Sequence, residues 1–300
     1  MIARALRSKR TLIVLALAVA ALVLLVAAGP ASADLLAPDK GASPNQEKIR
    51  TLYLITGIMG LIVFVGVEAV IIYAVIKFRR KRGAPDPVAV HGNSPLEIGW
   101  TIGAIVLVTV VAVVTFLFLP GIENPPKSGA NGLQTAAYVP YAAVGQAPPP
   151  GGKSLRIHIN GQQYIWRFDY VGEKPLDAGR PVYAYTDMYV PINTTVTLKI
   201  YSSDVIHSWW IPQLGGKADA TPGHTNETWF KISKPGVYKG QCAELCGENH
   251  ADMRARVIAL PVDQYKAWIE RQRSNILASQ KALAAQRKAG IGEALSKSNQ

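Results

Sequence analysis

The residues most capable of chemistry are two cysteines, a histidine and a methionine within one stretch of twelve residues: Cys242, Cys246, His250 and Met253. A second histidine, His207, lies 35 residues upstream in the run Asp-Val-Ile-His-Ser-Trp-Trp. Thiolate, imidazole and a weak thioether are together the ligands that suit copper in electron transfer. The spacing therefore predicts a metal site with a redox role.

The second cysteine changes which copper site is expected. A mononuclear blue-copper site uses one cysteine, two histidines and a methionine, so one thiol here is additional. Two thiolates can bridge two copper ions, and each ion then takes one imidazole. The thioether of Met253 and the backbone carbonyl of Glu244, which lies between the cysteines, fill the remaining weak positions.

Two other interpretations of the same atoms stay open at this point. Two cysteines and two histidines also suit zinc, although Met253 adds nothing to zinc and the spacing is not that of a zinc finger. A disulfide is compatible with an exported domain, although three intervening residues would make a tight loop. The remaining histidines are expected to be surface or turn residues: His91, His158 and His224.

An all-β domain over residues 153–265 is expected to position the cluster. Leu155, Ile157 and Ile159 alternate with polar residues, which is the pattern of a half-buried strand. Further strands are expected at 182–190, 194–202, 225–232, 237–240 and 254–260. Glycine and proline turns separate them, which favours a sandwich or a small barrel.

Two apolar runs predict a helical hairpin in a membrane. Residues 51–76 and 98–119 are each about long enough to span a bilayer as a helix. A basic cluster, Lys77–Arg82, directly follows the first run, so the positive-inside rule places the loop 77–97 in the cytoplasm. The N-terminal segment 34–50 and everything after residue 119 are then extracytoplasmic.

The N-terminus has the parts of a secretory signal peptide over residues 1–33: a basic start, an apolar middle and an Ala-Ser-Ala end. A retained membrane helix is the alternative, because the apolar run is long for a signal. The linker 120–152 is rich in proline and glycine and shows no periodicity, whereas the tail 266–300 is charged and expected to be helical. The net charge of +12 lies in the N-terminus, the membrane flank and this tail, so no nucleic-acid partner is expected.

Two glutamates lie in or beside the apolar runs. Glu68 is inside the first run, where an ionisable group costs on the order of 2–3 kcal/mol or more, so we expect it to face protein. We favour a carboxyl group hydrogen-bonded to a partner helix over a proton site. Glu97 lies at the cytoplasmic mouth of the second run, where a solvated acid is expected on physical grounds alone.

The pattern Cys-x3-Cys-x3-His-x2-Met, with the upstream Asp-x2-His-Ser-Trp, resembles the binuclear copper (CuA) domain of subunit II of haem–copper cytochrome c oxidases. The resemblance covers roughly residues 45–265. It implies a two-helix transmembrane hairpin followed by an all-β cupredoxin-like Greek-key barrel. It also implies one ligand through a backbone carbonyl, that of Glu244, and five side-chain ligands: His207, Cys242, Cys246, His250 and Met253.

The resemblance assigns further roles. Glu244 is similar to the family residue whose carboxylate reaches a magnesium or manganese ion at the border with subunit I, and Leu214–Gly223 resembles the loop near the haem propionates. Glu97 matches the family's glutamate at the cytoplasmic entrance of the K proton pathway, in place of the solvated acid expected above. The tryptophan that receives electrons in the family is replaced here by Tyr164, while Trp166 matches the second aromatic of that motif.

The function implied is that of subunit II of a respiratory cytochrome c oxidase in a bacterial plasma membrane, with both termini outside. Such a subunit accepts electrons from cytochrome c and passes them to haem in subunit I for oxygen reduction coupled to proton pumping. The implied partners are subunits I and III and a cytochrome c. The cytochrome c must be a separate protein, because the chain has no Cys-x2-Cys-His haem motif. A membrane-anchored copper-delivery protein and a purely structural subunit are the competing readings.

Overall fold

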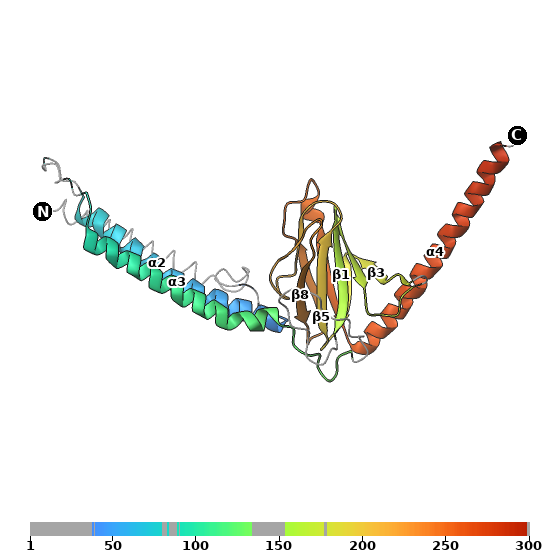
Figure 1. Cartoon of the computed structure of the whole chain (residues 1–300), viewed down its shortest axis with the longest axis horizontal. Coiled ribbons are helices and arrows are strands. Elements are labelled where there is room, and N and C mark those ends of the chain that lie inside the picture. The colour runs from blue at the N-terminus through green and yellow to red at the C-terminus, as the bar shows by residue number, and fades with distance from the viewer. Residues whose placement is uncertain are drawn as a thin grey trace, which may run out of the picture. The chain divides into compact units, whose positions relative to one another are not determined.

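The computed structural model describes residues 38, 40–79, 83, 89, 91–133, 154–176 and 179–298. Its long helices are α2 (Pro44–Lys77), α3 (Ser94–Glu123) and α4 (Val262–Ser298), and a β domain lies between α3 and α4 in the chain (Figure 1). The expected signal peptide, the centre of the cytoplasmic loop and the linker residues 134–152 lie outside the described residues.

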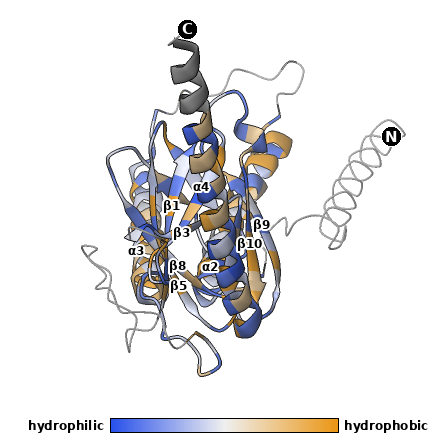
Figure 2. Ribbon diagram, turned by 90° about the vertical axis from the view of Figure 1, so that its right-hand side faces the viewer, coloured by the Kyte–Doolittle hydropathy of each residue, from blue (hydrophilic) through white to orange (hydrophobic). Residues whose placement is uncertain are grey.

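Helices α2 and α3 pack side by side as a hairpin, and most residues of both are hydrophobic. Figure 2 colours the ribbon by the hydropathy of each residue. Both helices are long and apolar enough to cross a membrane. Each extends beyond its apolar run, and each has a proline in its first turn, where a missing N–H costs nothing. Helix α3 also continues through Pro120 to Glu123, one turn past the expected end at residue 119.

In the described part of the chain, ten strands form two five-stranded sheets that enclose one core. The first sheet has the order β3-β2-β1-β5-β8 and the second β4-β10-β9-β6-β7. The strands are β1 (Leu155–Gln162), β2 (Ile165–Tyr170), β3 (Val182–Tyr185), β4 (Asp187–Pro191), β5 (Thr195–Ser202), β6 (His207–Trp210), β7 (Ala218–Ala220), β8 (Asn226–Lys231), β9 (Gly236–Cys242) and β10 (Arg254–Leu260). This is the expected cupredoxin-like fold, with parallel pairs β1–β5 and β4–β10 that require long connections.

The alternation predicted for β1 is confirmed, because Leu155, Ile157 and Ile159 are all buried in the core. The segment expected as one strand at 182–190 is instead two strands in different sheets. They separate at Thr186, whose φ of 60° turns the chain from β3 into β4. A β-branched residue rarely adopts this conformation, so the sequence gives no signal for the break.

The start of α2 and the end of α3 are fixed to the β domain by polar contacts. Asn45 donates through Nδ2 to the backbone oxygen of Trp229, 2.8 Å away, and Ser43 accepts from the backbone N–H of Lys231 at 3.0 Å. The indole N–H of Trp229 donates to the backbone oxygens of Ile122 and Glu123, at 2.9 and 3.0 Å, which the end of α3 leaves without helical partners.

Helix α4 begins at Val262, so the boundary expected after residue 265 falls inside it. Tyr265, Trp268 and Ile269 are buried in the same core as the strands, and the Trp268 ring stacks on Tyr189 with centroids 4.4 Å apart. The first turns of this helix are therefore part of the β domain. From Lys281 to Ala289 its residues are exposed.

Candidate metal centre

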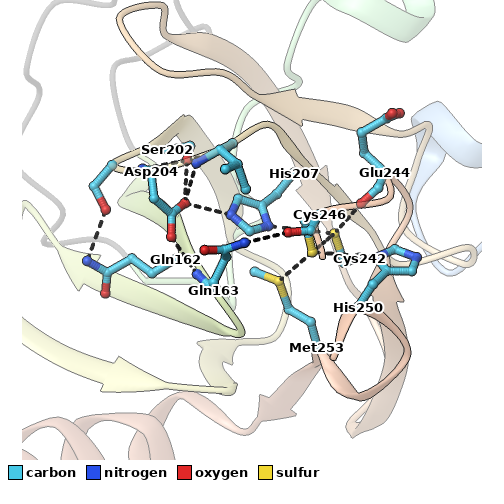
Figure 3. A network of polar contacts seen from close by, with 12 residues as sticks. Gln162, Gln163, Ser202, Asp204, His207, Cys242, Glu244, Cys246, His250 and Met253 are labelled. Atoms are coloured by element: carbon cyan, nitrogen blue, oxygen red, sulfur yellow. Dashed lines mark hydrogen bonds and ion pairs between the residues drawn. The ribbon is translucent and has the colours of Figure 1, made fainter. Parts of the chain in front are cut away.

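The six expected ligands converge at one end of the β domain, where three segments meet (Figure 3). His207 is the first residue of β6 and Cys242 the last of β9, and these two strands pair with each other. Cys246 lies in the loop after β9, and His250 begins the 3-10 helix η2 (His250–Asp252). Met253 immediately precedes β10, so strand ends position three of the donor groups: His207, Cys242 and Met253.

The two thiols form the centre of this cluster, and each has its own imidazole. The Sγ atoms of Cys242 and Cys246 are 3.9 Å apart. Cys242 Sγ lies 3.9 Å from His207 Nδ1 and 3.2 Å from the backbone oxygen of Glu244. Cys246 Sγ lies 3.6 Å from His250 Nδ1 and 3.8 Å from Met253 Sδ. Each sulfur thus has one imidazole nitrogen and one weaker donor beside it.

Both cysteines are free thiols, which removes the disulfide interpretation. Cys242 and Cys246 are buried, and His207 and Met253 are fully covered. Burial, together with the neighbouring Cys242, raises the pKa of the Cys246 thiol to about 11. A metal ion must therefore displace a proton to bind there, which is normal for thiolate sites.

His207 is held from behind by Asp204, a residue to which the sequence analysis gave no role. Asp204 Oδ1 lies 2.9 Å from Nε2 of His207, so this nitrogen carries the hydrogen and Nδ1 keeps its lone pair toward the cysteines. Burial alone would raise the pKa of Asp204. Hydrogen bonds from Gln163, His207, Val205 and Ser202 outweigh that effect and lower its pKa to about 2.

The turn between β1 and β2 closes over the cysteine loop. Gln163 donates from its backbone to Asp204 Oδ2 at 2.7 Å and from its side-chain amide to the backbone oxygen of Cys246, also at 2.7 Å. The Tyr164 hydroxyl accepts from the backbone N–H of Glu248 at 3.1 Å. A Cβ atom on Gly247 would lie 2.6 Å from that hydroxyl, so only glycine permits this contact. Gln163 is a second supporting residue that the sequence analysis missed.

The two aromatic candidates differ in exposure. Trp166 is fully buried and packs edge-on against the ring of His207, with centroids 5.8 Å apart. Tyr164 is partly exposed, and its hydroxyl contacts the loop that follows Cys246. A protein that approaches this end of the domain therefore meets Tyr164 and not Trp166.

The remaining predicted residues lie apart from the thiol cluster or point away from it. The Glu244 side chain is exposed and extends away from the sulfurs, while its backbone oxygen faces them (Figure 3). Glu97 accepts a hydrogen bond from the backbone N–H of Asn93 at 2.9 Å and so caps the start of α3. His158 is on the outer side of β1, where burial and then the charges of Lys199 and Arg156 lower its pKa.

This donor set fits copper better than zinc. His207, Cys242 and Cys246 place their ligand atoms within 4.8 Å of one another. A single zinc ion needs four nitrogen or sulfur ligands and makes no use of a thioether. Here the buried Met253 thioether adds a third soft sulfur, and soft sulfur ligands with imidazole select copper.

The fold and site define a class of protein: a membrane-anchored cupredoxin-like domain with a thiolate, imidazole and thioether copper site. Residues 155–260 match the family described as cytochrome c oxidase subunit II, periplasmic domain, and residues 31–118 match its transmembrane domain. The chain belongs to the cytochrome c oxidase subunit II family, and the family implies a copper centre.

Two relatives of similar sequence agree with this assignment. The chain is 31% identical over 246 residues to cytochrome c oxidase subunit 2 of Cereibacter sphaeroides, covering 77% of this chain and 78% of the relative. It is 36% identical over 228 residues to the protein of the same name from Alkalihalophilus pseudofirmus, covering 76% of this chain and 59% of that relative's length. The periplasmic domain of subunit II of cytochrome oxidase from Bradyrhizobium japonicum aligns with a TM-score of 0.37 at 31% identity, over 41% of this chain and 96% of that one.

Proposed function

We propose that this chain is subunit II of a respiratory cytochrome c oxidase and that His207, Cys242, Glu244, Cys246, His250 and Met253 hold a binuclear copper centre. One observation carries the proposal: two free, buried thiols lie 3.9 Å apart, and each has its own imidazole nitrogen within 3.9 Å. A single-copper site has no use for the second thiol. When bound, the copper pair supplies one-electron redox chemistry between a cytochrome c and the haem of subunit I.

The protein's contribution is a rigid ligand cage that changes little with oxidation state. Cys242 is fixed by its place at the end of β9, and its backbone N–H donates to the oxygen of Met253 at 2.8 Å. His207 is locked between Asp204 and the ring of Trp166. Such outer contacts orient metal ligands and set their basicity. Rigid ligands keep the reorganisation on electron transfer small.

Electrons enter beside Tyr164 in this proposal, because Tyr164 is the aromatic side chain that a donor can reach over the cysteine loop. Trp166 is the inner aromatic, in contact with His207 and shielded from solvent. The donor is a separate cytochrome c, either soluble or membrane-bound. The exposed carboxylate of Glu244 is free to reach a magnesium or manganese ion shared with subunit I.

The membrane arrangement of the proposal follows from charge. Lys77 and the basic residues after it keep the loop 77–97 in the cytoplasm of a bacterial plasma membrane. Both termini and the copper domain are then outside, after removal of the signal peptide 1–33. Glu97 is consequently at the cytoplasmic surface, where it caps α3 and leads protons into the pathway of subunit I. Subunit III completes the oxidase.

The experiment uses the intact oxidase, purified through an affinity tag on this chain. Cys246→Ser should abolish the binuclear copper absorption and EPR spectrum and cytochrome c oxidation, while the subunits still assemble. Ser203→Ala, which removes a hydroxyl that accepts a hydrogen bond from Gln162 at 3.0 Å, is the matched control and should keep both. Normal turnover by the Cys246→Ser oxidase would disprove the proposal. Copper that exchanges freely from a chain without partner subunits would favour a copper-delivery protein instead.

A further inference from the structure

Helix α4 carries a run of positive charge that neither the metal centre nor the membrane hairpin uses. Between Arg271 and Ala289 it has five basic residues and no acid. Residues 281–289 are exposed and extend past Leu277, the last residue of α4 that packs on the core. An exposed run of one charge sign attracts partners of the opposite sign.

Part of this run lines a hollow of about 650 Å³ between α4 and the loop before β3. The lining combines three cationic side chains with one amide and two apolar side chains: Arg180, Arg287, Lys288, Gln280, Leu283 and Ala284. The five positions on α4 follow one another at helical spacing, so they share one face of the helix. The hollow is therefore both cationic and partly apolar.

The cationic groups of the hollow are available to a ligand. Arg180 donates through Nη2 to Oε1 of Gln280 at 2.9 Å, which orients its guanidinium and leaves other N–H groups to bind. Within the described part of the chain, Arg287 and Lys288 make no hydrogen bond or ion pair. Leu283 beside them is 47% exposed. Carboxylates around an apolar side chain are the chemistry that fits this combination.

The order of strands separates the hollow from the attachment to the hairpin. Arg180 lies two residues before β3, and β3 and β8 are opposite edges of the first sheet. The start of α2 is hydrogen-bonded to β8 through Asn45. Four strand spacings of about 4.8 Å put roughly 19 Å between the two edges. Lipid head groups around the hairpin are therefore poorly placed to enter the hollow, and an exported protein is the better occupant.

The charge of the hollow is also opposite to that of the copper end of the domain. The segment 243–254 has three exposed acids against one exposed base: Glu244, Glu248, Asp252 and Arg254. A protein that docks over Tyr164 is thus favoured when its surface is basic, whereas one that enters the hollow is favoured when its surface is acidic. The two sites fit different partners.

We propose that the hollow between α4 and Arg180 binds an acidic segment of a second exported protein, distinct from the electron donor. The carboxylates of that segment pair with the three cations, and an apolar side chain covers Leu283. Helix α4 is then a docking arm that holds this protein beside the β domain. The inference goes beyond the proposed function, because none of its residues lies at the copper centre.

Binding of a labelled Glu-Glu-Leu-Glu-Glu peptide to the purified intact oxidase, followed by fluorescence anisotropy, tests the charge preference. The control peptide, Gln-Gln-Leu-Gln-Gln, has nearly the same shape without the charge. Arg287→Glu reverses a charge in the hollow, and Arg271→Glu makes the same change about 160° around α4. We expect the acidic peptide to bind about tenfold tighter than the control peptide at low ionic strength.

Arg287→Glu should remove this preference, whereas Arg271→Glu should keep it. Both variants should retain the copper content and cytochrome c oxidation of the wild type. Equal binding of the two peptides, or equal losses in the two variants, would overturn the inference. So would slower cytochrome c oxidation by Arg287→Glu at unchanged copper content, because the hollow would then belong to the docking surface of the donor.

A photo-cross-linking phenylalanine analogue identifies the partner in intact cells. In place of Ala284 the analogue lies in the hollow, and in place of Ala282, about 160° around the helix, it is the matched control. We expect a product from position 284 alone, joined to an acidic segment of an exported protein and lost in Arg287→Glu. Adducts with lipid alone, or no product at all, would contradict the proposal.

Discussion

The β domain and the hairpin solve the problem of burying apolar surface in opposite ways. In the β domain, both sheets and the first turns of α4 enclose a core in which Ile157, Trp166 and Phe230 are almost completely covered. In the hairpin, α3 has no buried residue, and the buried residues of α2 are the polar Asn45 and Gln46 at its outer end. One region is complete within the chain, while the other depends on lipid and partner subunits.

This difference explains where each region keeps its polar groups. At the metal centre, Asp204 accepts four hydrogen bonds from its own chain, so the ligands are positioned before any partner arrives. In the hairpin, the described residues donate no hydrogen bond to the central polar group, Glu68. The electron-transfer site is therefore preorganised, whereas the membrane region is organised by assembly.

The largest expected effect tests the contrast itself. Ile157→Ala opens a cavity in the core of the β domain and should lower its free energy of unfolding by about 2–5 kcal/mol. Val106→Ala removes a side chain that is 56% exposed on α3 and should leave that free energy unchanged. Denaturant unfolding of the full chain in detergent, followed by tryptophan fluorescence, measures both. Equal losses would mean that the two regions share one core.

The next effect concerns preorganisation at the copper site. Asp204→Asn removes a carboxylate that orients His207 and should reduce copper affinity about 10- to 100-fold. Asp187→Asn is the matched control, because Asp187 pairs with Arg256 on β10, 2.6 Å apart, away from the ligands. Competition for copper with a chelator reports the affinity. An unchanged affinity for Asp204→Asn would show that the ligand cage holds without this support.

A smaller effect is expected at the junction of the two regions. Trp229→Phe keeps an aromatic ring but loses the indole hydrogen bonds to the end of α3, worth about 0.5–1.5 kcal/mol. Tryptic cleavage after Lys127, just beyond α3, should accelerate roughly two- to twelvefold. Trp210→Phe is the control. It changes a tryptophan whose ring contacts the ammonium group of Lys217, and it should leave the rate of cleavage unchanged. Identical rates for the two variants would count against a fixed junction.

The smallest effect is a pH dependence of α4 docking. Burial raises the pKa of Glu173 above its usual 4.5; Tyr265, Arg273 and Lys266 oppose the shift and Glu270 adds to it. An acid with a raised pKa stabilises the fold fully below its ordinary pKa, and this contribution is lost as pH rises through the raised value. The β domain should thus lose some stability as pH rises above about 4.5, and Glu173→Gln should flatten the slope. If the stability of Glu173→Gln kept the pH dependence of the wild type, another group would be its cause.

Much of the architecture could be predicted from periodicity and spacing. The apolar runs identified both helices of the hairpin, and the alternation in β1 identified the inner face of its sheet. The metal cluster was visible because four of its side chains fall within twelve residues. These signals are local, so a single sequence carries them.

The features that sequence reasoning missed depend on tertiary contacts. Asp204 and Gln163 are 41 residues apart, and only the closure of the β1–β2 turn over β6 brings them together. Thr186 breaks a continuous β pattern without a glycine or proline to mark it. Helix α4 packs against the β domain through the aromatic side chains of Tyr265 and Trp268. Most of its other residues are polar or charged, so composition could not predict this packing.

The most direct test of the account is the copper content of the purified, fully loaded oxidase, measured against this chain by metal analysis and EPR before and after Cys242→Ser. We predict two copper atoms per chain beyond any held by subunit I, sharing one unpaired electron, and loss of that signal in the variant. A single copper per chain with a mononuclear EPR spectrum, or a variant with an unchanged signal, would contradict a thiolate-bridged pair.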